Sequence, residues 1–338
     1  MKNHRFLFAG FRHPHISGLY DRVSAHPDCA IAGAWEGDGA TRRQLAAEGR
    51  IDLTHEDFAT MLAEGGGTVV AIGDTYGRRG ALAIAALQAG CHVISDKPLC
   101  TRREELETIA ELAREKGLSV GCQLDLTEAP VLRRLRGLVR RGTLGKVQTV
   151  TVLAQHPLRY GSRPGWYFEP GEHGGTLNDI GVHVFDLLPW LTGSPWRRIL
   201  TARDWNAKAT EAPHFRDCAQ LHGVLENGAA CFADVSYLAP DRSGYSQNQY
   251  WRITVHGTAG MAEASYGAET LMVVTDADES ARDVTTSSVP DGERDCLQNF
   301  LDEIEGKGTG GIEKLTTENI LKTSRLALEA QQRAASES

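Results

Sequence analysis

The sequence predicts an α/β protein of two domains: an N-terminal domain with a parallel β-sheet, then a C-terminal α+β domain with a large, mostly antiparallel open sheet. Short apolar runs of strand length alternate with helical stretches over residues 1–122, a pattern typical of crossover connections in a parallel sheet. Over residues 123–338 strand-like runs follow one another with turn residues between them, which favours antiparallel pairing. At 338 residues the chain also exceeds what one hydrophobic core usually supports.

The elements of the first domain alternate regularly between strand and helix. The predicted strands are residues 6–9, 29–35, 68–72, 92–95 and 118–122. The predicted helices are residues 16–25, 41–48, 58–63, 80–89 and 104–116. Gly90 and Gly117 directly follow the last two helices, where a left-handed C-cap residue favours glycine. The domain boundary is a change of this rhythm, because no low-complexity linker marks it.

The second domain combines a few helices with a long series of strands. The predicted helices are residues 130–141, 176–191, 295–304 and 317–334. A long strand is predicted at residues 147–154, and strand-like signals separated by turns fill residues 199–274. An aromatic, glycine-rich loop occupies the interval between the long strand and the second helix.

Composition and charge limit the classes of partner. The chain is 41% apolar and carries a formal charge of −8, so neither nucleic acid nor an anionic membrane surface is an expected partner. We expect no signal peptide and no membrane span, since no apolar run approaches the required length. The seven cysteines are scattered without a C-x-x-C pair, which indicates a reducing cytoplasm and no zinc site.

The first turn, residues 9–18 (AGFRHPHISG), follows the first predicted strand, where a dinucleotide-binding fold keeps its G-x-G-x-x-G fingerprint. Gly10 fits the first glycine, whereas Arg12 and His15 take the second and third positions. Arginine there can offset the lost backbone approach by pairing with a phosphate. His13 and His15 have two interpretations: a metal pair, disfavoured because residues two apart at a helix start diverge, or contacts to cofactor phosphate or substrate.

Glu36 ends the second predicted strand, 26 residues after Gly10. An acidic residue near this position accepts hydrogen bonds from the adenosine ribose of a bound dinucleotide. A carboxylate there favours NAD over NADP, because it repels the 2′-phosphate, although Arg42 and Arg43 nearby soften that preference. The alternative is a carboxylate that caps the following turn, and position alone does not separate the two interpretations.

Lys97 lies in the segment Asp96–Leu99 (DKPL), directly after the fourth predicted strand. Ligands of open parallel sheets bind at the carboxyl ends of the strands, so Lys97 is expected to point into that crevice. Pro98 restricts Lys97 to extended geometry, which holds its ammonium group in a defined place. The alternative is a surface lysine in a loop.

Asp179 and His183 are four residues apart, so on one helix they share a face and can meet the same ligand. Asp186 follows three residues later and can orient the imidazole of His183. The pair allows a proton relay, half of a metal site, or an ion pair on a helix surface. Gly174 and Gly175 before it let backbone come close to a ligand.

Together these motifs resemble the glucose-fructose oxidoreductase, inositol dehydrogenase and MocA family (Gfo/Idh/MocA). Lys97-Pro98 matches the family's E-K-P motif, with Asp96 in place of Glu. The helix motif G-x-x-x-D-x-G-x-H-x-x-D-(x)6-G is matched by Gly175, Asp179, Gly181, His183, Asp186 and Gly193. The segments AALQAGCHVISDKPL, VRRGTLGKVQTV and ITVHGTAGMAEA extend the resemblance over nearly the whole chain. Two departures are the eroded first turn and residues 74–79 (DTYGRR), where the family has T-P-N-x-x-H.

The resemblance implies a Rossmann domain, a bound NAD whose nicotinamide lies between the domains, and hydride transfer at a carbinol or carbonyl of a sugar, inositol or polyol. It implies catalytic roles for Lys97, which would hydrogen-bond the reacting oxygen, and for Asp179 and His183, which would handle its proton; no metal is needed. The residues expected to bind the cofactor are Gly10, Arg12, His13, Glu36, Asp74, Asp96 and Lys97. A homodimer or homotetramer through the C-terminal sheet is implied as well.

The loop of residues 155–175 is where family members line the substrate pocket. The residues expected to bind substrate are Arg159, Arg163, Trp166, Tyr167 and His183; a structured surface loop is the alternative. The two arginines leave room for an acidic substrate such as a uronate. Two rival functions stay open: a glycosidase that uses tightly held NAD in a transient oxidation, and a non-enzymatic sensor or scaffold whose cofactor site is weakened.

Overall fold

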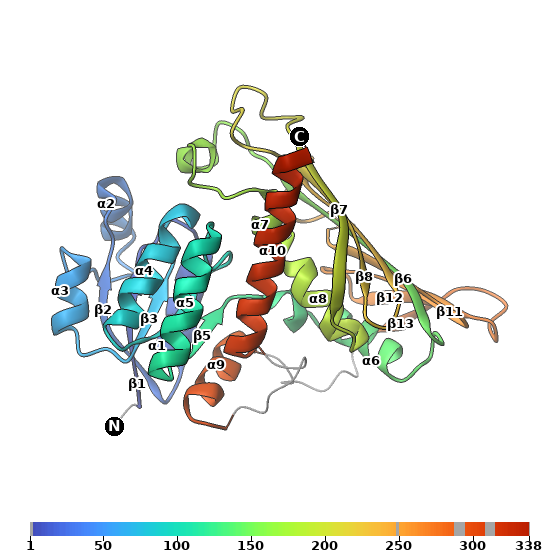
Figure 1. Ribbon diagram of the computed structural model, residues 1–338, viewed down its shortest axis with the longest axis horizontal. Coiled ribbons are helices and arrows are strands. Elements are labelled where there is room, and N and C mark those ends of the chain that lie inside the picture. The colour runs from blue at the N-terminus through green and yellow to red at the C-terminus, as the bar shows by residue number, and fades with distance from the viewer. Residues whose placement is uncertain (1–2, 248–249, 287–294, 308–314, 338) are drawn as a thin grey trace.

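The computed structural model describes residues 3–247, 250–286, 295–307 and 315–337, and it contains a parallel sheet and a second, larger sheet (Figure 1). The parallel sheet has the strand order β2-β1-β3-β4-β5. Its strands are β1 His4–Ala9, β2 Cys29–Trp35, β3 Val69–Ile72, β4 His92–Ser95 and β5 Val120–Cys122. The predicted parallel sheet is confirmed.

The parallel sheet is buried on both faces, which explains its uninterrupted apolar strands. In β1, Leu7 and Ala9 belong to one apolar cluster, whereas Phe6 and Phe8 belong to the other. The helices of this part of the chain are α1 His15–Ala25, α2 Gly39–Glu48, α3 Phe58–Glu64, α4 Tyr76–Gln88 and α5 Arg103–Lys116. Ligand-binding groups are therefore confined to the carboxyl ends of the strands.

The larger sheet has the strand order β13-β12-β11-β10-β6-β9-β8-β7 and is mostly antiparallel, with one parallel pair, β6 and β9. Its strands are β6 Val147–Pro157, β7 Trp196–Trp205, β8 Cys218–Leu225, β9 Ala230–Ala239, β10 Arg252–Gly257, β11 Gly260–Ser265, β12 Thr270–Thr275 and β13 Arg282–Thr285. The predicted open sheet is confirmed, and β13 lies beyond the strands that the sequence predicts.

The remaining helices pack against one or both of the sheets. They are α6 Pro130–Arg140, α7 Thr176–Asp179, α8 Val182–Thr192, α9 Cys296–Ile304 and α10 Thr317–Glu337, with 3-10 turns η1 Asp125–Glu128 and η2 Gly165–Phe168. Helix α10 contacts β7 on one side and α5 and β5 on the other, so it ties the two halves together (Figure 1). Leu297 and Phe300 of α9 complete an apolar cluster of the parallel sheet.

Two predicted helices differ from the observed ones. The helix predicted at residues 80–89 begins earlier, at Tyr76, so that it starts directly after the turn that follows β3. The helix predicted at residues 176–191 is broken into α7 and α8 at Ile180 and Gly181, where the amide of His183 donates to the carbonyl of Ile180 instead of continuing an α-helical ladder from Asp179.

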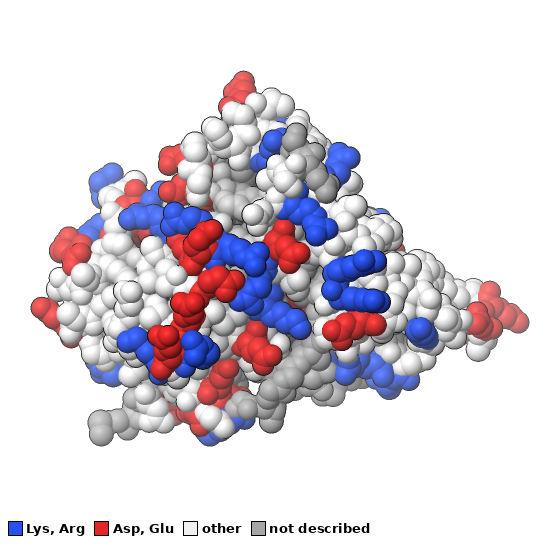
Figure 2. Space-filling model, viewed as in Figure 1, with Lys and Arg blue, Asp and Glu red and all other residues white. Residues whose placement is uncertain are grey.

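Charge on the face seen in Figure 2 is mixed. Acidic and basic side chains alternate where α5 and α10 lie, for example in the ion pair between Arg325 and Glu107 at 3.0 Å. Among the described residues, no helix is long and apolar enough to cross a membrane.

Candidate active site

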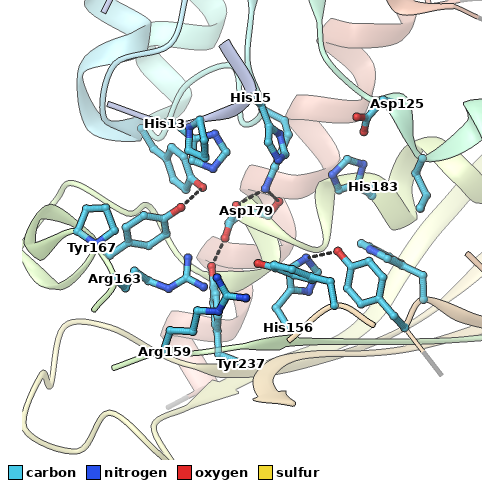
Figure 3. A pocket seen from close by; sticks show the side chains of 18 of the residues that line it. His13, His15, Asp125, His156, Arg159, Arg163, Tyr167, Asp179, His183 and Tyr237 are labelled. Atoms are coloured by element: carbon cyan, nitrogen blue, oxygen red, sulfur yellow. Dashed lines mark hydrogen bonds and ion pairs between the residues drawn. The ribbon is translucent and has the colours of Figure 1, made fainter. Parts of the chain in front are cut away.

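A cavity of about 490 Å³ lies where the carboxyl ends of the parallel strands face the large sheet (Figure 3). Segments that follow β1, β3, β4 and β5 form one wall, and the end of β6 with the loop after it, β9 and the turn before β10 form the other. The residues that line it are Arg12, His13, Pro14, His15, Tyr76, Lys97, Asp125, Leu126, His156, Arg159, Ser162, Arg163, Pro164, Tyr167, Asp179, His183, Tyr237, Tyr245, Tyr250, Trp251 and Tyr266. It thus brings together residues from both sheets.

Lys97 follows β4 and points into this cavity, where its side chain is buried. Its ammonium nitrogen Nζ lies 2.6 Å from Oδ1 of Asp179. The Lys97-Pro98 segment is held from behind by Arg79, whose guanidinium donates to the carbonyl of Pro98 at 3.2 Å and also to that of Lys97. The interpretation as a surface lysine is therefore wrong.

Asp179 stands at the end of α7 and is the hub of the polar contacts in the cavity. Besides Lys97, its carboxylate accepts hydrogen bonds from the hydroxyl of Tyr237 and from His173, whose Nε2 lies 3.2 Å from Oδ2. Gly175, just before α7, has φ +92 and no room for a Cβ beside Gln331, so it fixes the entry into this short helix.

The electrostatic balance around Asp179 keeps both members of the pair charged. Burial alone would raise the pKa of Asp179, but the Lys97 ammonium and the hydrogen bond from His173 hold that pKa well below its usual range. Burial alone would lower the pKa of Lys97, and the Asp179 carboxylate raises it instead. A buried pair of this kind fixes the position of both groups.

His183 begins the first turn of α8 and lines the same cavity. Burial, with the nearby Lys97 charge, holds its pKa well below 6.5, so the ring is neutral near pH 7. Its Nδ1 is buried without a hydrogen-bond partner in the described structure. Asp186 lines a separate small cavity with Pro189 and Lys322, and its role in orienting the His183 ring stays a prediction.

Asp179 and His183 do not form an ion pair on a helix surface, since both are buried and Asp179 pairs with Lys97. They also do not share one continuous helix, because the helix is interrupted between α7 and α8. The spacing predicted that the two side chains meet one ligand because they share a helix face. They do face the same cavity, although they come from two separate helices (Figure 3).

The first turn keeps one glycine for a clear steric reason. Gly10 has φ +79, and a Cβ there would lie 2.6 Å from the Cβ of Asp74. Several of the turn's amides are already used within the protein: Gly10 donates to Trp35, Phe11 donates to Glu36, and His13 donates to Gly73. The side chain of Arg12, by contrast, lines the cavity, with Nη1 3.6 Å from Oδ2 of Asp38.

The contacts of Glu36 favour a carboxylate that caps its own turn over one that binds the adenosine ribose. Its carboxylate is buried and accepts hydrogen bonds from the amides of Phe11 at 2.5 Å and Asp38 at 2.7 Å. Burial raises its pKa, while these two hydrogen bonds act in the opposite direction. Asp74 is likewise fully buried, behind the cavity wall, where one oxygen accepts from the amide of Thr75.

His13 and His15 converge, contrary to the expected divergence. Their ring centroids are 4.6 Å apart, and both face the buried carboxylate of Asp96. His13 bonds Asp96 directly through Nδ1, and Nδ1 of His15 lies 3.5 Å from Oδ1. Pro14 between them is the N-cap of α1, and its restricted φ fixes the backbone that aims both rings at one side.

The predicted substrate residues divide into two groups. Arg159, Arg163 and Tyr167 line the cavity; Tyr167 is buried, whereas Arg159 is exposed, and their contact with substrate stays a prediction. The guanidinium of Arg163 lies 4.6 Å from the ring centre of Tyr167 and donates to the carbonyls of Leu158 and Pro157. Trp166 is buried but does not line the cavity; it stacks on the rear face of Tyr167 with ring centroids 4.0 Å apart.

Several residues of the site are not predicted from the sequence. Tyr76, His156, His173, Tyr237 and Trp251 all contact the cavity or its polar hub. His173 lies inside the segment predicted to form the pocket, so its position was a usable signal. Tyr237 and Trp251 reach the site from β9 and from the turn before β10, and only the tertiary fold brings them there.

Sequence comparisons match most of the chain to known proteins. A sequence profile described as "Oxidoreductase family, NAD-binding Rossmann fold" matches residues 8–123, and one for the GFO/IDH/MocA C-terminal domain matches residues 132–263. D-glucoside 3-dehydrogenase of Escherichia coli is 29% identical over 141 residues, covering 41% of this chain and 38% of that protein. The chain spans about half or less of the length of several curated relatives that it matches.

Solved structures extend the likeness of fold to the whole chain. A putative oxidoreductase from Erwinia carotovora superimposes with a TM-score of 0.84 at 22% identity, covering 98% of each chain. An inositol dehydrogenase homologue from Azotobacter vinelandii, complexed with NAD+, gives 0.79 at 18% identity, covering 99% of this chain and 96% of that one.

The fold and the matched profiles define an oxidoreductase with an NAD-binding Rossmann domain. The chain belongs to the GFO/IDH/MocA family. The fold resemblance stated from the motifs is thereby confirmed.

Proposed function

We propose that this protein is an NAD-dependent dehydrogenase or reductase that acts at a carbinol or carbonyl group of a sugar, inositol or related polyol. The observation that carries the proposal is the Lys97–Asp179 pair at 2.6 Å, buried in a cavity at the carboxyl ends of the parallel strands with His183 on the same wall. The name of the Escherichia coli relative, a D-glucoside 3-dehydrogenase, supports the same substrate class.

Each of the three groups has a part in moving the proton that accompanies hydride transfer. The Lys97 ammonium donates a hydrogen bond to the reacting oxygen and stabilises the negative charge that develops on it. His183 is neutral because its pKa is held low, so it accepts the hydroxyl proton during oxidation and returns it during reduction. Asp179 keeps Lys97 protonated and in place.

The residues of the first turn and its surroundings fit a dinucleotide. When bound, NAD accepts or donates the hydride at its nicotinamide ring. Gly10 permits the tight turn, and the Arg12 guanidinium on the cavity wall is placed to hold a phosphate, in the role that backbone amides have in the usual fingerprint. The buried Glu36 carboxylate disfavours a 2′-phosphate nearby, so NAD is proposed ahead of NADP. His13, Asp74, Asp96 and Lys97 complete the proposed cofactor surface.

The proposal extends to an acidic sugar derivative such as a uronate, which would lie beside Arg159 and Arg163. The guanidinium groups of Arg159 and Arg163 both line the cavity, beside the hydroxyl-bearing rings of Tyr167 and Tyr245. Nε and Nη2 of Arg163 already donate to backbone carbonyls, so the guanidinium fork proposed to bind a carboxylate is that of Arg159. Substrate oxygens would lie between these arginines and Lys97.

The proposal is tested with a panel of sugars, inositols and uronates mixed with NAD or NADP. Formation of reduced cofactor, followed by absorbance, is the expected result for at least one polyol or uronate. A panel that yields no reduced cofactor with NAD or NADP, by an enzyme that binds either one, would contradict it.

One observation favours a second candidate, a sensor or scaffold with a weakened cofactor site. The amides of Gly10, Phe11 and His13 are already hydrogen-bonded within the protein, and Pro14 has none to offer. Calorimetric titration separates the candidates: absence of NAD and NADP binding selects the scaffold.

Three further features are proposed on lesser grounds. We propose two domains, residues 1–122 and 123–338, because all strands of the parallel sheet lie in the first range.

Self-association into a homodimer or homotetramer through the large sheet is supported by the exposed Phe232 and Leu238 on β9 and is tested by light scattering. A cytoplasmic location agrees with seven cysteines that are all free thiols.

A further inference from the structure

We propose that His13, His15 and Asp96 form a binding site for one divalent transition-metal ion such as Zn²⁺, Mn²⁺ or Co²⁺. One ligand atom from each residue lies within 4.8 Å of the other two. The site shares His13 and Asp96 with the proposed cofactor surface, but metal binding is measured without NAD, so its failure is distinguishable from a failure of the proposed function.

The donor set is suited to such an ion. Two imidazoles and one carboxylate are borderline ligands that favour first-row transition metals over Mg²⁺ or Ca²⁺. Three protein ligands with open positions are typical of sites that bind a further, exchangeable ligand. Each of the three residues also comes from a defined place: His13 and His15 flank the N-cap Pro14, and Asp96 follows β4.

The spacing of two of the donors already matches a shared ion. Nδ1 of His15 lies 3.5 Å from Oδ1 of Asp96. Metal–nitrogen and metal–oxygen bonds of ~2.1 Å at a tetrahedral angle separate two ligands by ~3.4 Å. His13 now bonds the other carboxylate oxygen directly, so binding requires its ring to turn away from Oδ2 toward the ion.

The Asp96 carboxylate is buried, and its two oxygens have different partners. Oδ2 faces His13 and the Arg79 guanidinium, whose Nη2 is 3.4 Å away. Among the described residues, Oδ1 accepts a hydrogen bond from the Lys97 amide at 2.7 Å and is approached by His15. His15 keeps about half of its side chain exposed (48%) and lines the cavity, so an ion reaches this side from solvent.

His13 and His15 line the cavity that also holds Lys97 and Asp179, so the open coordination positions of a bound ion would face it. An oxygen of a bound anionic or polyhydroxylated ligand can occupy them. The altered first turn thereby acquires a role that a glycine-rich turn lacks, because glycine offers no side-chain donor.

The test is metal content and Co²⁺ titration of tag-free, full-length protein. Co²⁺ is added to the metal-stripped protein, followed by its visible absorption and by calorimetry, and bound metal is counted by mass spectrometry after dialysis. We expect about one equivalent per chain, and a loss of affinity of at least ~10-fold in His15→Ala and in Asp96→Asn. His214→Ala, an exposed histidine outside the cavity, is the matched control and should bind as the unaltered protein does.

His15→Ala removes a half-exposed side chain, so its thermal unfolding without metal is expected to match that of the unaltered protein, and loss of cobalt binding then reports a lost ligand. Sub-stoichiometric binding by the unaltered protein, or His15→Ala binding Co²⁺ with unchanged affinity, would overturn the proposal.

Discussion

The two ends of the cavity differ in how far they follow the family pattern. At one end, Lys97, Asp179 and His183 match the family motifs and form a buried, charge-balanced group. At the other end, the turn of residues 10–15 keeps one glycine and replaces the others with side chains that reach the cavity. The reacting end therefore tolerates little change, whereas the anchoring end can exchange backbone contacts for side-chain contacts.

The reason for the difference is physical. Proton transfer and charge stabilisation need particular groups within hydrogen-bond reach of the reacting atoms. At this site the buried ammonium of Lys97 is such a group. A phosphate, by contrast, is bound by any array of donors, whether amides, guanidinium groups or imidazoles.

Lys97→Ala is expected to have the largest effect. Removing the ammonium should lower kcat/KM by at least ~10³-fold, which corresponds to about 4 kcal/mol of transition-state stabilisation. Steady-state assays of reduced-cofactor formation measure this, and NAD affinity by calorimetry should change only a few-fold. Lys146→Ala, at an exposed lysine outside the cavity, is the control. An active Lys97→Ala enzyme would remove Lys97 from the proposed mechanism.

Gly10→Ala should destabilise the fold at the anchoring end. The new Cβ would meet Asp74 in a backbone of φ +79, so a loss of about 2–4 kcal/mol in the free energy of unfolding is expected. Gly18→Ala is the matched control: it lies within α1 with nothing near its added Cβ, and it should stabilise by about 0.5–1 kcal/mol. Urea denaturation measures both. Equal stability of the two variants would contradict the geometry of the turn.

Each end of the cavity also buries a neutral histidine, which predicts a pH dependence of stability. Burial lowers the pKa of His13 to about 4 and that of His156 to about 3, from 6.5. Below pH 6.5 the unfolded chain therefore binds more protons than the folded one. Stability should fall as the pH drops from 6.5 towards 4, by up to about 1.4 kcal/mol per pH unit for each histidine.

Urea denaturation between pH 7 and pH 4.5 measures this dependence. The buried carboxylates Asp96 and Asp179, with pKa values held well below 3.8, lose their contribution only at lower pH, whereas Glu36 and Asp74, whose pKa values are raised by burial, partly oppose the fall. His156→Gln should flatten the slope, and His214→Gln, at an exposed position, should leave it unchanged. A flat profile for the unaltered protein would show that these histidines titrate normally in the folded state.

Arg159→Gln should have the smallest effect. Its guanidinium is exposed at the cavity rim, so its loss should raise KM for a uronate by about 10-fold while KM for the corresponding neutral sugar stays the same. Paired steady-state assays on the two substrates measure the difference. An equal change in KM for both substrates would argue against a substrate carboxylate beside Arg159.

Local patterns predicted most of the fold, because period and end signals depend on neighbours in sequence. Strands β2 and β4 and the glycine that follows α5 lie where their residues indicate. The break between α7 and α8 was not predicted, because it depends on packing of the segment around Gly181. The convergence of His13 and His15 also escaped prediction, because it requires Asp96, which is distant in the chain.

The residues of the candidate site divide in the same way, into those that local motifs predict and those that the tertiary fold brings in. Lys97, Asp179 and His183 were predicted from short motifs, and all three line one cavity. Tyr237, which donates a hydrogen bond to Asp179, lies 58 residues further along the chain and carries no local signal. The pairing of Glu36 with the amides of its own turn also depends on the folded loop, so position alone did not decide between its two interpretations.

The most direct test of the central contrast is a calorimetric titration of NAD into the unaltered protein, Arg12→Gln and Arg43→Gln. If the Arg12 side chain has taken over phosphate contacts from glycine, NAD should bind the unaltered protein and the exposed-site control Arg43→Gln alike. The dissociation constant of Arg12→Gln should be at least ~10-fold higher. No binding of NAD by the unaltered protein, or equal affinity of all three proteins, would contradict the account.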